Sequence, residues 1–393
     1  MGIHVTSTCR VCASADVQPM LSLINQPVHC NVLWPRRDQA LEAPKGDLRL
    51  GFCHRCGHIS NLAFVPALME YTADYENSLH FSPHFQRYCT DLARRLTGTY
   101  DVSGKSVIDI GCGKGDFLAE VCAVGGNRGY GFDPSYSAAQ ATHRADLTLT
   151  FFNEFYSDSH RDIAADLICC RHVLEHIHRP AEFLTGIRRI IGERTGTVVY
   201  FEVPNALYIL RDLGIWDLIY EHCSYFSPAS LEHLFATSGY SVARVGEAYD
   251  GQFIGVDCRP NGQQLGGATW PEMIKDLANL VSVFTSRYRT KIMQWQTRLD
   301  QLRWEGKRTV VWGGGSKGVT FLNVFKSPAI EFMVDINPRK QGKYVGGTGQ
   351  EIIAPEKLVE VEPDAVIIMN PVYRPEIEAK LSELGLAPEI MVT

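Results

Sequence analysis

The sequence predicts an α/β protein with a small N-terminal domain of short strands, a central domain built on a doubly wound parallel sheet, and a smaller Rossmann-like C-terminal domain. Near the N-terminus four cysteines form two closely spaced pairs, Cys9/Cys12 and Cys53/Cys56. Two glycine-rich turns, at 111–115 and 313–318, each follow a short apolar stretch. Around these turns, strand and helix patterns alternate, which is typical of a parallel sheet.

Length and composition favour several domains and a small-molecule substrate. A chain of 393 residues exceeds the size at which a single hydrophobic core stops growing. We therefore expect a metal-binding domain over 1–70, a central domain over 71–265, and a linker helix with the C-terminal domain over 266–393. The formal net charge of -6 offers no broad basic surface to nucleic acid. Without a recognisable signal peptide or membrane-spanning stretch, the expected location is the cytoplasm, as a monomer or a homodimer.

The N-terminal domain is expected to be a ribbon of strands held by a metal ion. Up to Asn61 the apolar residues come in short alternating stretches such as 48–52, with no long helical period. In so small a unit, metal ligation supplies folding free energy that a modest core cannot. Two cysteine pairs at x2 spacing provide four thiolates, the ligand set of a closed, structural zinc site. The spacing predicts zinc bound by Cys9, Cys12, Cys53 and Cys56, with His54 and His58 beside the site and not ligands.

An amphipathic helix is predicted next, over 82–97, because its apolar residues recur at intervals of three and four, at Phe85, Tyr88, Leu92 and Leu96. Apolar strands and helical stretches then alternate. Strands are expected at 106–110, 128–132, 166–170 and 197–201, and helices from 116 and over 180–191. This order predicts a parallel sheet with helices on both faces.

The first glycine turn has the sequence Asp109-Ile-Gly-Cys-Gly-Lys-Gly115. Its Gly-x-Gly-x-Gly spacing, with an acid two residues ahead, resembles the S-adenosylmethionine turn of class I methyltransferases. Dinucleotide enzymes need Gly-x-Gly-x-x-Gly, so that a helix N-terminus meets the pyrophosphate, which S-adenosylmethionine lacks. An acid at the end of the next strand, about 20 residues on, is positioned to bind ribose. We expect the cofactor to be bound by Asp109, Gly111, Gly113, Gly115 and Asp133, with Asp109 orienting its methionine portion.

The C-terminal domain contains the second glycine turn. A long helix is expected over 270–304, and strands at 309–312, 330–334 and 364–369. The turn Gly313-x-Gly-x-x-Gly318, with Asp335 after the following strand, matches the dinucleotide pattern. Because one such match has low specificity, three interpretations stay open: a turn without a ligand, a site for the diphosphate of a nucleotide-linked substrate helped by Lys317, and a nicotinamide site.

Two clusters carry acid–base groups. In the segment 216–227, Glu221 precedes His222 and could raise its basicity if the two side chains meet, as a general base near neutral pH requires. A capping and core role for this segment is the alternative. His172, Glu175 and His176 follow the strand 166–170, at the sheet edge where α/β folds bind ligands. For His172 and Glu175 the alternative is the start of a solvated helix.

Nearly the whole chain resembles the sugar C-methyltransferases that act on nucleotide-linked keto-deoxysugars. The resemblance rests on the paired cysteines and on five strings: Val107–Gly115, Val173–Ile177, Glu221–Ser227, Gly314–Gly318 and Val334–Gly342. It implies a zinc-binding N-terminal domain, a doubly wound class I methyltransferase domain and a Rossmann-like C-terminal domain. It also implies a role in deoxysugar biosynthesis, with methylation at the carbon next to a ketone, C3 of a 4-keto sugar, and the nucleotide diphosphate held between the last two domains.

The resemblance also implies roles for single residues. His222 would be the general base, with Glu221 as its neighbour, and His176 an active-site histidine. Tyr75 would be the tyrosine that precedes the catalytic domain, a role that fits Tyr71 less well. The remaining expected site residues are Tyr220 in catalysis, His172 at the cofactor, and Lys317, Asn323 and Asn370 at the substrate.

The chain departs from that family at two places. The family has Tyr-His-Glu-His where this chain has Ile219-Tyr-Glu-His222, and a Gly-Gly-Ser string is replaced by 249–253. Substrate identity therefore stays open, including a non-sugar ketone. The competing functions are an O-methyltransferase on the same scaffold, a nicotinamide-dependent sugar oxidoreductase that uses the second glycine turn, and a non-catalytic zinc protein that binds nucleotide sugars.

Overall fold

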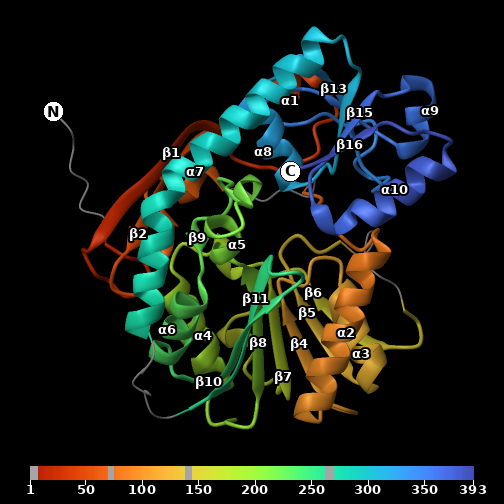
Figure 1. Ribbon diagram of the computed structural model, residues 1–393. Coiled ribbons are helices and arrows are strands. Elements are labelled where there is room, and N and C mark those ends of the chain that lie inside the picture. The colour runs from red at the N-terminus through yellow and green to blue at the C-terminus, as the bar shows by residue number, and fades with distance from the viewer. Residues whose placement is uncertain (1–7, 70–74, 138–143, 262–269) are drawn as a thin grey trace.

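The computed structural model describes residues 8–69, 75–137, 144–261 and 270–393, which form three sheets (Figure 1). The N-terminal sheet is antiparallel, in the order β1 (Val17–Pro27), β2 (Lys45–Cys53), β3 (Ile59–Asn61) and β9 (Ser224–Tyr225). Alternate residues of β2, Leu48, Leu50 and Phe52, are buried, which confirms the predicted ribbon of strands. The fourth strand, β9, comes from the central domain and was not predicted.

The central sheet has seven strands in the order β10-β11-β8-β7-β4-β5-β6. The strands from β8 to β6 run parallel, whereas β10 and β11 form an antiparallel hairpin at one edge. Their bounds are β4 (Ser106–Ile110), β5 (Arg128–Phe132), β6 (Thr148–Phe152), β7 (Leu167–Arg171), β8 (Val198–Pro204), β10 (Tyr240–Ala248) and β11 (Phe253–Pro260). This order confirms the predicted doubly wound sheet.

Helices cover both faces of this sheet because its inner strands are apolar on both sides. Val107 of β4 packs with α2 (Pro83–Tyr100) and α3 (Asp116–Gly125). The next residue, Ile108, packs on the opposite face with α4 (Pro180–Ile191) and α6 (Pro228–Thr237). The alternation of side chains along one strand therefore separates the two layers of helices seen in Figure 1.

The C-terminal sheet is parallel, in the order β14-β13-β12-β15-β16, and is Rossmann-like as predicted. Its strands are β12 (Thr309–Trp312), β13 (Ile330–Val334), β14 (Glu351–Ile353), β15 (Ala365–Ile368) and β16 (Glu389–Val392). The remaining helices are α1 (Arg37–Leu41), α5 (Ala206–Leu210), α7 (Trp270–Trp304), α8 (Ser316–Phe325), α9 (Leu358–Val361) and α10 (Arg374–Glu383). Short 3-10 helices span Pro66–Leu68, Asp158–His160, Leu174–His176, Ile215–Asp217, Pro355–Lys357 and Pro371–Tyr373.

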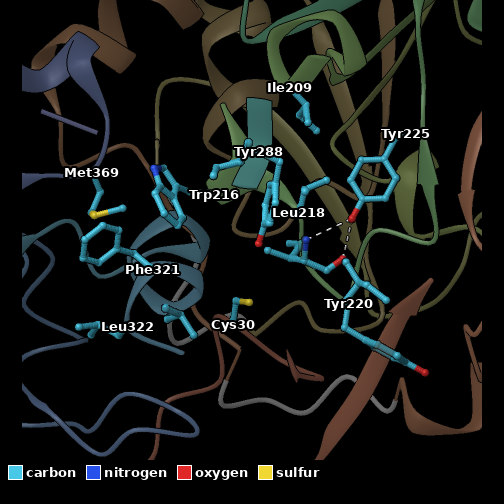
Figure 2. Packing of buried hydrophobic residues seen from close by; sticks show 14 of the residues in the cluster. Cys30, Ile209, Trp216, Leu218, Tyr220, Tyr225, Tyr288, Phe321, Leu322 and Met369 are labelled. Carbon is cyan, nitrogen blue, oxygen red and sulfur yellow. Dashed lines mark hydrogen bonds between the residues drawn. The ribbon is translucent and has the colours of Figure 1, made fainter. Parts of the chain in front are cut away.

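One hydrophobic core joins all three domains. Helix α7 runs along the N-terminal sheet and reaches the C-terminal domain (Figure 1). Figure 2 shows part of this core, in which Trp216 of the central domain packs against Phe321 of α8, with ring centroids 4.8 Å apart. Cys30 and Tyr288 belong to the same cluster. The domains are therefore held in a fixed arrangement by apolar contacts and not only by linkers. No described helix combines the length and apolar character that crossing a membrane requires.

A buried ion pair fixes α2 to the edge hairpin, and we predict that breaking it destabilises the protein. Arg95 donates to both oxygens of Asp257, at 2.6 and 3.1 Å, and the Asp257 side chain is 2% exposed. Arg95→Met leaves that carboxylate buried and unpaired, which should lower the free energy of unfolding by about 3 kcal/mol in urea denaturation. The control is Arg94→Met, which removes an exposed pair with Asp91 and should cost less than about 1 kcal/mol. Equal losses for the two variants would contradict this account.

Candidate active site

The four predicted zinc ligands lie together. The Sγ atoms of Cys9 and Cys56 are 3.6 Å apart, as are those of Cys12 and Cys53, and all four sulfurs lie within 4.8 Å of one another. Tetrahedral zinc with Zn–S bonds of about 2.3 Å places its sulfurs about 3.8 Å apart, so the cluster fits one zinc ion. His54 lies outside the cluster, bonded to Gln18 at 2.9 Å.

The zinc site is connected to the segment 221–227. Arg10, between two ligands, donates to the carbonyl oxygens of Asn61 at 3.0 Å and Cys223 at 3.4 Å. Next to the second cysteine pair, the carbonyl oxygen of Gly57 accepts a hydrogen bond from the Ser227 hydroxyl at 3.2 Å. Ser227 also caps α6. The metal site therefore orders the segment that carries Glu221 and His222.

A cavity of about 1150 Å³ lies between the central and C-terminal domains. Both glycine turns border it, the first through Gly111 and Gly113 and the second through Gly313 and Gly315. The other predicted site residues that line it are Tyr75, Asp109, Asp133, His172, His176, His222, Lys317 and Asn370. Residues from distant parts of the chain thus converge on one space, which suits a site for two ligands.

The first glycine turn presents its backbone to the cavity. Gly113 has a φ of 55°, and a Cβ built on it would meet no atom within 4 Å, so this position faces open space. Gly111 has a φ of 71°, and a Cβ there would lie 2.2 Å from Val173. Gly115, packed against Phe151, begins α3 and is not among the described cavity-lining residues. The turn therefore needs its glycines for backbone shape and for close approach of a ligand.

Two aspartates flank this turn. Asp133 accepts from Gly113 N–H at 2.9 Å and from Ser135 N–H at 2.7 Å. Asp109 is 4% exposed, and its burial raises the pKa of the carboxyl to about 7, with Arg171 opposing the rise and Asp133 adding to it. A carboxylate at the end of the second strand and an open glycine backbone are the groups that bind a ribose and the chain attached to it. These residues fit S-adenosylmethionine.

Three histidines gather around one carboxylate in the cavity wall. Glu175 Oε1 lies 3.7 Å from His172 Nδ1 and 4.0 Å from His176 Nε2. The rings of His176 and His222 meet edge to face, with centroids 5.0 Å apart. Burial lowers the pKa of His222 well below its usual value, and the charges of His176, His172 and Lys317 lower it further. His222 is therefore neutral near pH 7 and able to accept a proton.

Glu221 does not pair with His222. Its carboxylate accepts from the Tyr75 hydroxyl at 2.5 Å and from the backbone N–H of Cys30. Its own carbonyl oxygen lies 3.0 Å from His176 Nδ1. The two neighbours in sequence thus point to different partners, and Glu221 holds Tyr75 at the cavity wall.

A buried network behind His172 was not predicted. Glu202, fully buried at the end of β8, accepts from Arg171 at 2.9 and 2.8 Å, from Tyr200 at 2.8 Å and from Tyr88. His172 Nε2 lies 3.2 Å from the same carboxylate. A glutamate that follows the apolar strand 197–201 was a sequence signal for such a network, because a buried charge needs partners.

The second glycine turn, like the first, has a backbone N–H that donates to the aspartate after the next strand. Gly314 N–H donates to Asp335 at 2.8 Å, and the Lys340 ammonium donates to the Gly314 carbonyl at 3.0 Å. A Cβ on Gly318 would lie 2.1 Å from the Gly313 carbonyl oxygen, so only glycine allows this close packing of helix on strand.

Two predicted substrate residues make contacts between the domains. Lys317 pairs with Asp217 of the central domain. Asn370 exchanges two amide hydrogen bonds with Gln252, at 3.0 and 3.1 Å, across the domain boundary.

Two predicted site residues lie elsewhere. Tyr220, which was predicted to be catalytic, packs in the shared core (Figure 2), stacks on Phe64 and accepts from Val65 N–H at 2.9 Å, so its side chain lies away from the cavity. Asn323 is 3% exposed and donates to two carbonyl oxygens, of Val319 and Gly346, so it supports α8 and not a substrate. Among the described residues that line the cavity, neither occurs. Tyr71 lies outside the described residues.

A further carboxylate, Glu76, joins the two domains beside the cavity and was also missed. It is 3% exposed and pairs with Lys114 of the first glycine turn. From the C-terminal domain it is contacted by Asn337 at 3.2 Å and Arg339 at 3.3 Å. The string 334–342 therefore contacts the cofactor turn through one buried acid.

We predict that Cys53→Ser abolishes zinc binding and lowers solubility, because removing one thiolate opens the closed site on which the N-terminal sheet depends. Metal analysis of the purified protein should find one zinc per wild-type chain and none in the variant. The control is Cys122→Ser, a buried cysteine outside the cluster, which should keep its zinc. A soluble Cys53→Ser protein that retains the metal would contradict the ligand assignment.

Three family models match the chain in the order of its domains. Residues 9–68 match a model described as "Putative zinc binding domain", 81–245 match "Methyltransferase domain", and 274–387 match "C-methyltransferase C-terminal domain". Among curated proteins, the chain is similar to C-methyltransferase NovU of Streptomyces niveus. The two are 26% identical over 390 residues, which cover 94% of this chain and 90% of the relative.

Solved structures align only in part. One is magnesium protoporphyrin IX methyltransferase (ChlM) of Synechocystis PCC 6803 with bound SAH, which is 16% identical to this chain. The alignment covers 48% of this chain and 90% of ChlM, with a TM-score of 0.34. The dimethyltransferase RosA of Streptomyces davawensis is 21% identical. That alignment covers 45% of this chain and 55% of RosA, with a TM-score of 0.35. Scores this low carry no argument about function. The three matched domains and the curated relative show that the protein is an S-adenosylmethionine-dependent methyltransferase, with a zinc-binding domain before the methyltransferase domain and a C-methyltransferase C-terminal domain after it.

Proposed function

We propose that the protein methylates the carbon next to a ketone in a nucleotide-linked sugar, C3 of a 4-keto-deoxysugar. The observation that carries this proposal is that two glycine turns and a pair of histidines line one cavity of about 1150 Å³. Cavities for one drug-sized ligand measure roughly 300–1000 Å³, so this one has room for a cofactor and a substrate. The similarity to C-methyltransferase NovU supports the same reaction type.

The first glycine turn would hold the cofactor. Asp133 would bind the ribose hydroxyls, while Gly111 and Gly113 would let the backbone approach the ligand. Asp109 and His172 line the neighbouring wall and would lie near the end of the cofactor that carries the methionine. When bound, S-adenosylmethionine supplies an electrophilic methyl group on its sulfonium.

The second glycine turn would hold the diphosphate of the substrate. Gly313 and Gly315 line the cavity, and Lys317 adds a cation beside them. Backbone amides at a glycine turn that opens a helix favour anions. The sugar of such a substrate would then extend toward the central domain, where His176 and His222 lie.

His222 is the proposed general base. A proton next to a ketone is acidic enough to be removed by a positioned base, provided that the enolate oxygen is stabilised. Neutral His222 can take this proton, which leaves the electron pair on the carbon that receives the methyl group. Tyr75 and His176 line the same cavity, and the Tyr75 hydroxyl would have to turn its hydrogen from Glu221 to donate to the enolate oxygen.

For the cofactor site we predict that Asp133→Ala weakens S-adenosylmethionine binding tenfold to a hundredfold. The physical reason is the loss of charge-assisted hydrogen bonds to the ribose, each worth roughly 1.5–3 kcal/mol. Titration calorimetry measures the affinity. Asp146→Ala, which removes an exposed carboxylate paired with Arg144, should bind as the wild type does. Unchanged affinity in Asp133→Ala would remove this aspartate from the site.

For catalysis we predict that His222→Ala lowers turnover at least a hundredfold, since a general base typically contributes about 10²–10⁴. Its affinity for S-adenosylmethionine should stay unchanged. Turnover is followed with a panel of nucleotide-linked keto-sugars, and the ¹³C spectrum of the product distinguishes a C-methyl carbon from a methoxy carbon. A methoxy product would identify an O-methyltransferase, and full turnover in the variant would remove His222 from its role.

A further inference from the structure

The histidines of the site share one buried carboxylate to which the proposed function gives no task. Glu175 is 1% exposed, lies on the 3-10 helix Leu174–His176, and lines the cavity. Its Oε1 faces His172 and His176. Its Oε2 is buried and has no hydrogen-bond partner among the described residues. A buried carboxylate oxygen without a donor is costly and uncommon, so it calls for a functional explanation.

The hydrogen bonds of His176 show which of its ring nitrogens can exchange a proton near Glu175. Its Nδ1 lies 3.0 Å from the Glu221 carbonyl oxygen, which can only accept, so Nδ1 carries a hydrogen and donates it. The other nitrogen, Nε2, is then the atom at which the ring gains or loses a proton, and it lies 4.0 Å from Glu175 Oε1. One oxygen of Glu175 and one nitrogen each of His176 and His222 lie within 4.8 Å of one another. A proton on either imidazole therefore places positive charge close to Glu175.

Three other carboxylates near the histidines already have partners, and one of them, Asp217, pairs with Lys317. Glu221 already accepts from Tyr75 and Cys30, and Glu202 accepts from Arg171 and two tyrosines. The other titratable or charged groups around the histidine pair, His176 and His222, are His29, Tyr75, His172, Lys317 and Asp217, and the charge of Asp217 is already matched by Lys317. An imidazolium formed there would be repelled by its surroundings unless a carboxylate compensates.

We propose that Glu175 is the positioning carboxylate of the histidine pair and stabilises the positive charge that the pair acquires when it takes the substrate proton. This inference rests on the proposed function. In that step the C–H bond breaks and its electron pair stays on the substrate carbon. The proton forms a new N–H bond on His222 and can pass to Nε2 of His176, beside Glu175. From there it leaves to solvent after the product is released.

The test compares Glu175→Gln, which keeps the shape and removes the charge, with Glu175→Asp, which keeps the charge. For Glu175→Gln we expect kcat to fall about a hundredfold, with unchanged KM and unchanged affinity for S-adenosylmethionine. The acid limb of its kcat profile should move to lower pH, because an imidazole without its carboxylate loses its proton more easily. Glu175→Asp should recover part of the rate. The control is Glu182→Gln on α4, an exposed glutamate paired with Arg179, which should behave as the wild type.

A second measurement needs no activity. Burial lowers the pKa of His172, but its bonds to Glu175 and Glu202 and their charges more than offset this, so the pKa is raised. In NMR titrations of the ligand-free protein, His172 should therefore lose its proton at lower pH in Glu175→Gln than in the wild type. Metal analysis accompanies the titration, because Glu175, His176 and His222 could also ligate a cation. We expect only the zinc of the cysteine cluster.

Different outcomes would contradict the proposed function and the proposed role of Glu175. A wild-type protein that methylates no carbon of any keto-sugar overturns the proposed function and this inference with it. An active wild type overturns the inference alone if Glu175→Gln keeps its kcat and pH profile, or if His172 titrates unchanged. The inference also fails if the loss of rate is matched by lost thermal stability, or if a second metal is bound by the wild type and absent from Glu175→Gln.

Discussion

The structure depends on the segment 221–227, which belongs to two domains at once. Ser224 and Tyr225 form the last strand of the N-terminal sheet, paired with Ile59 and Ser60 of β3. Immediately before them, His222 lines the cavity and Glu221 holds Tyr75 at its wall. Immediately after them, Ser227 caps α6 and bonds to the zinc-binding turn. Zinc ligation therefore does more than fold a small domain, because it fixes one edge of the sheet from which the proposed base projects.

Three carboxylates close to the cavity each have fixed partners. Glu202 is matched by Arg171 and His172, Glu221 by the Tyr75 hydroxyl and a backbone N–H, and Asp217 by Lys317. Each carboxylate holds a side chain of the cavity in one orientation, which is how a site stays organised without a ligand. The backbone of His172 is strained, because this residue adopts a left-handed φ of 55° that non-glycine residues seldom take. Such strain persists only where surrounding contacts fix the backbone, and here they are the bonds to Glu202 and Glu175.

Periodicity and glycine spacing predicted most of the fold. The strands at 106–110, 128–132 and 309–312 and the helix over 270–304 have the predicted bounds, because apolar runs there end at glycine turns or polar residues. The two-residue strand β9 could not be predicted, since it is too short to show alternation and its partner is distant in the chain. The edge hairpin of β10 and β11 and the strands β6, β14 and β16 were also missed. Most of these lie near sheet edges, where partial exposure weakens the apolar signal.

Most of the residues predicted for the site line one cavity, but their hydrogen-bond partners were predicted less well. Glu221 and His222 are adjacent in sequence, but their side chains have different partners, and Tyr220 beside them turns into the core. The pairing carboxylate of the histidines, Glu175, resembled the start of a solvated helix. Contacts between domains, such as those of Glu76 and Glu202, depend on tertiary packing that no local pattern reports.

The two glycine turns face one cavity because one acid holds them together. Glu76 binds Lys114 next to the first turn and Asn337 and Arg339 after the strand that follows the second. Burial would raise the pKa of Glu76, but the hydrogen bond and charge of Lys114 more than offset this, so the pKa is lowered and the group is ionised near neutral pH. Its single negative charge lies next to both Lys114 and Arg339 and offsets part of the repulsion between these cations across the domain boundary. A second contact across this boundary joins Lys317 to Asp217, and both residues line the cavity, so the shape of the cavity depends on the contact between the domains.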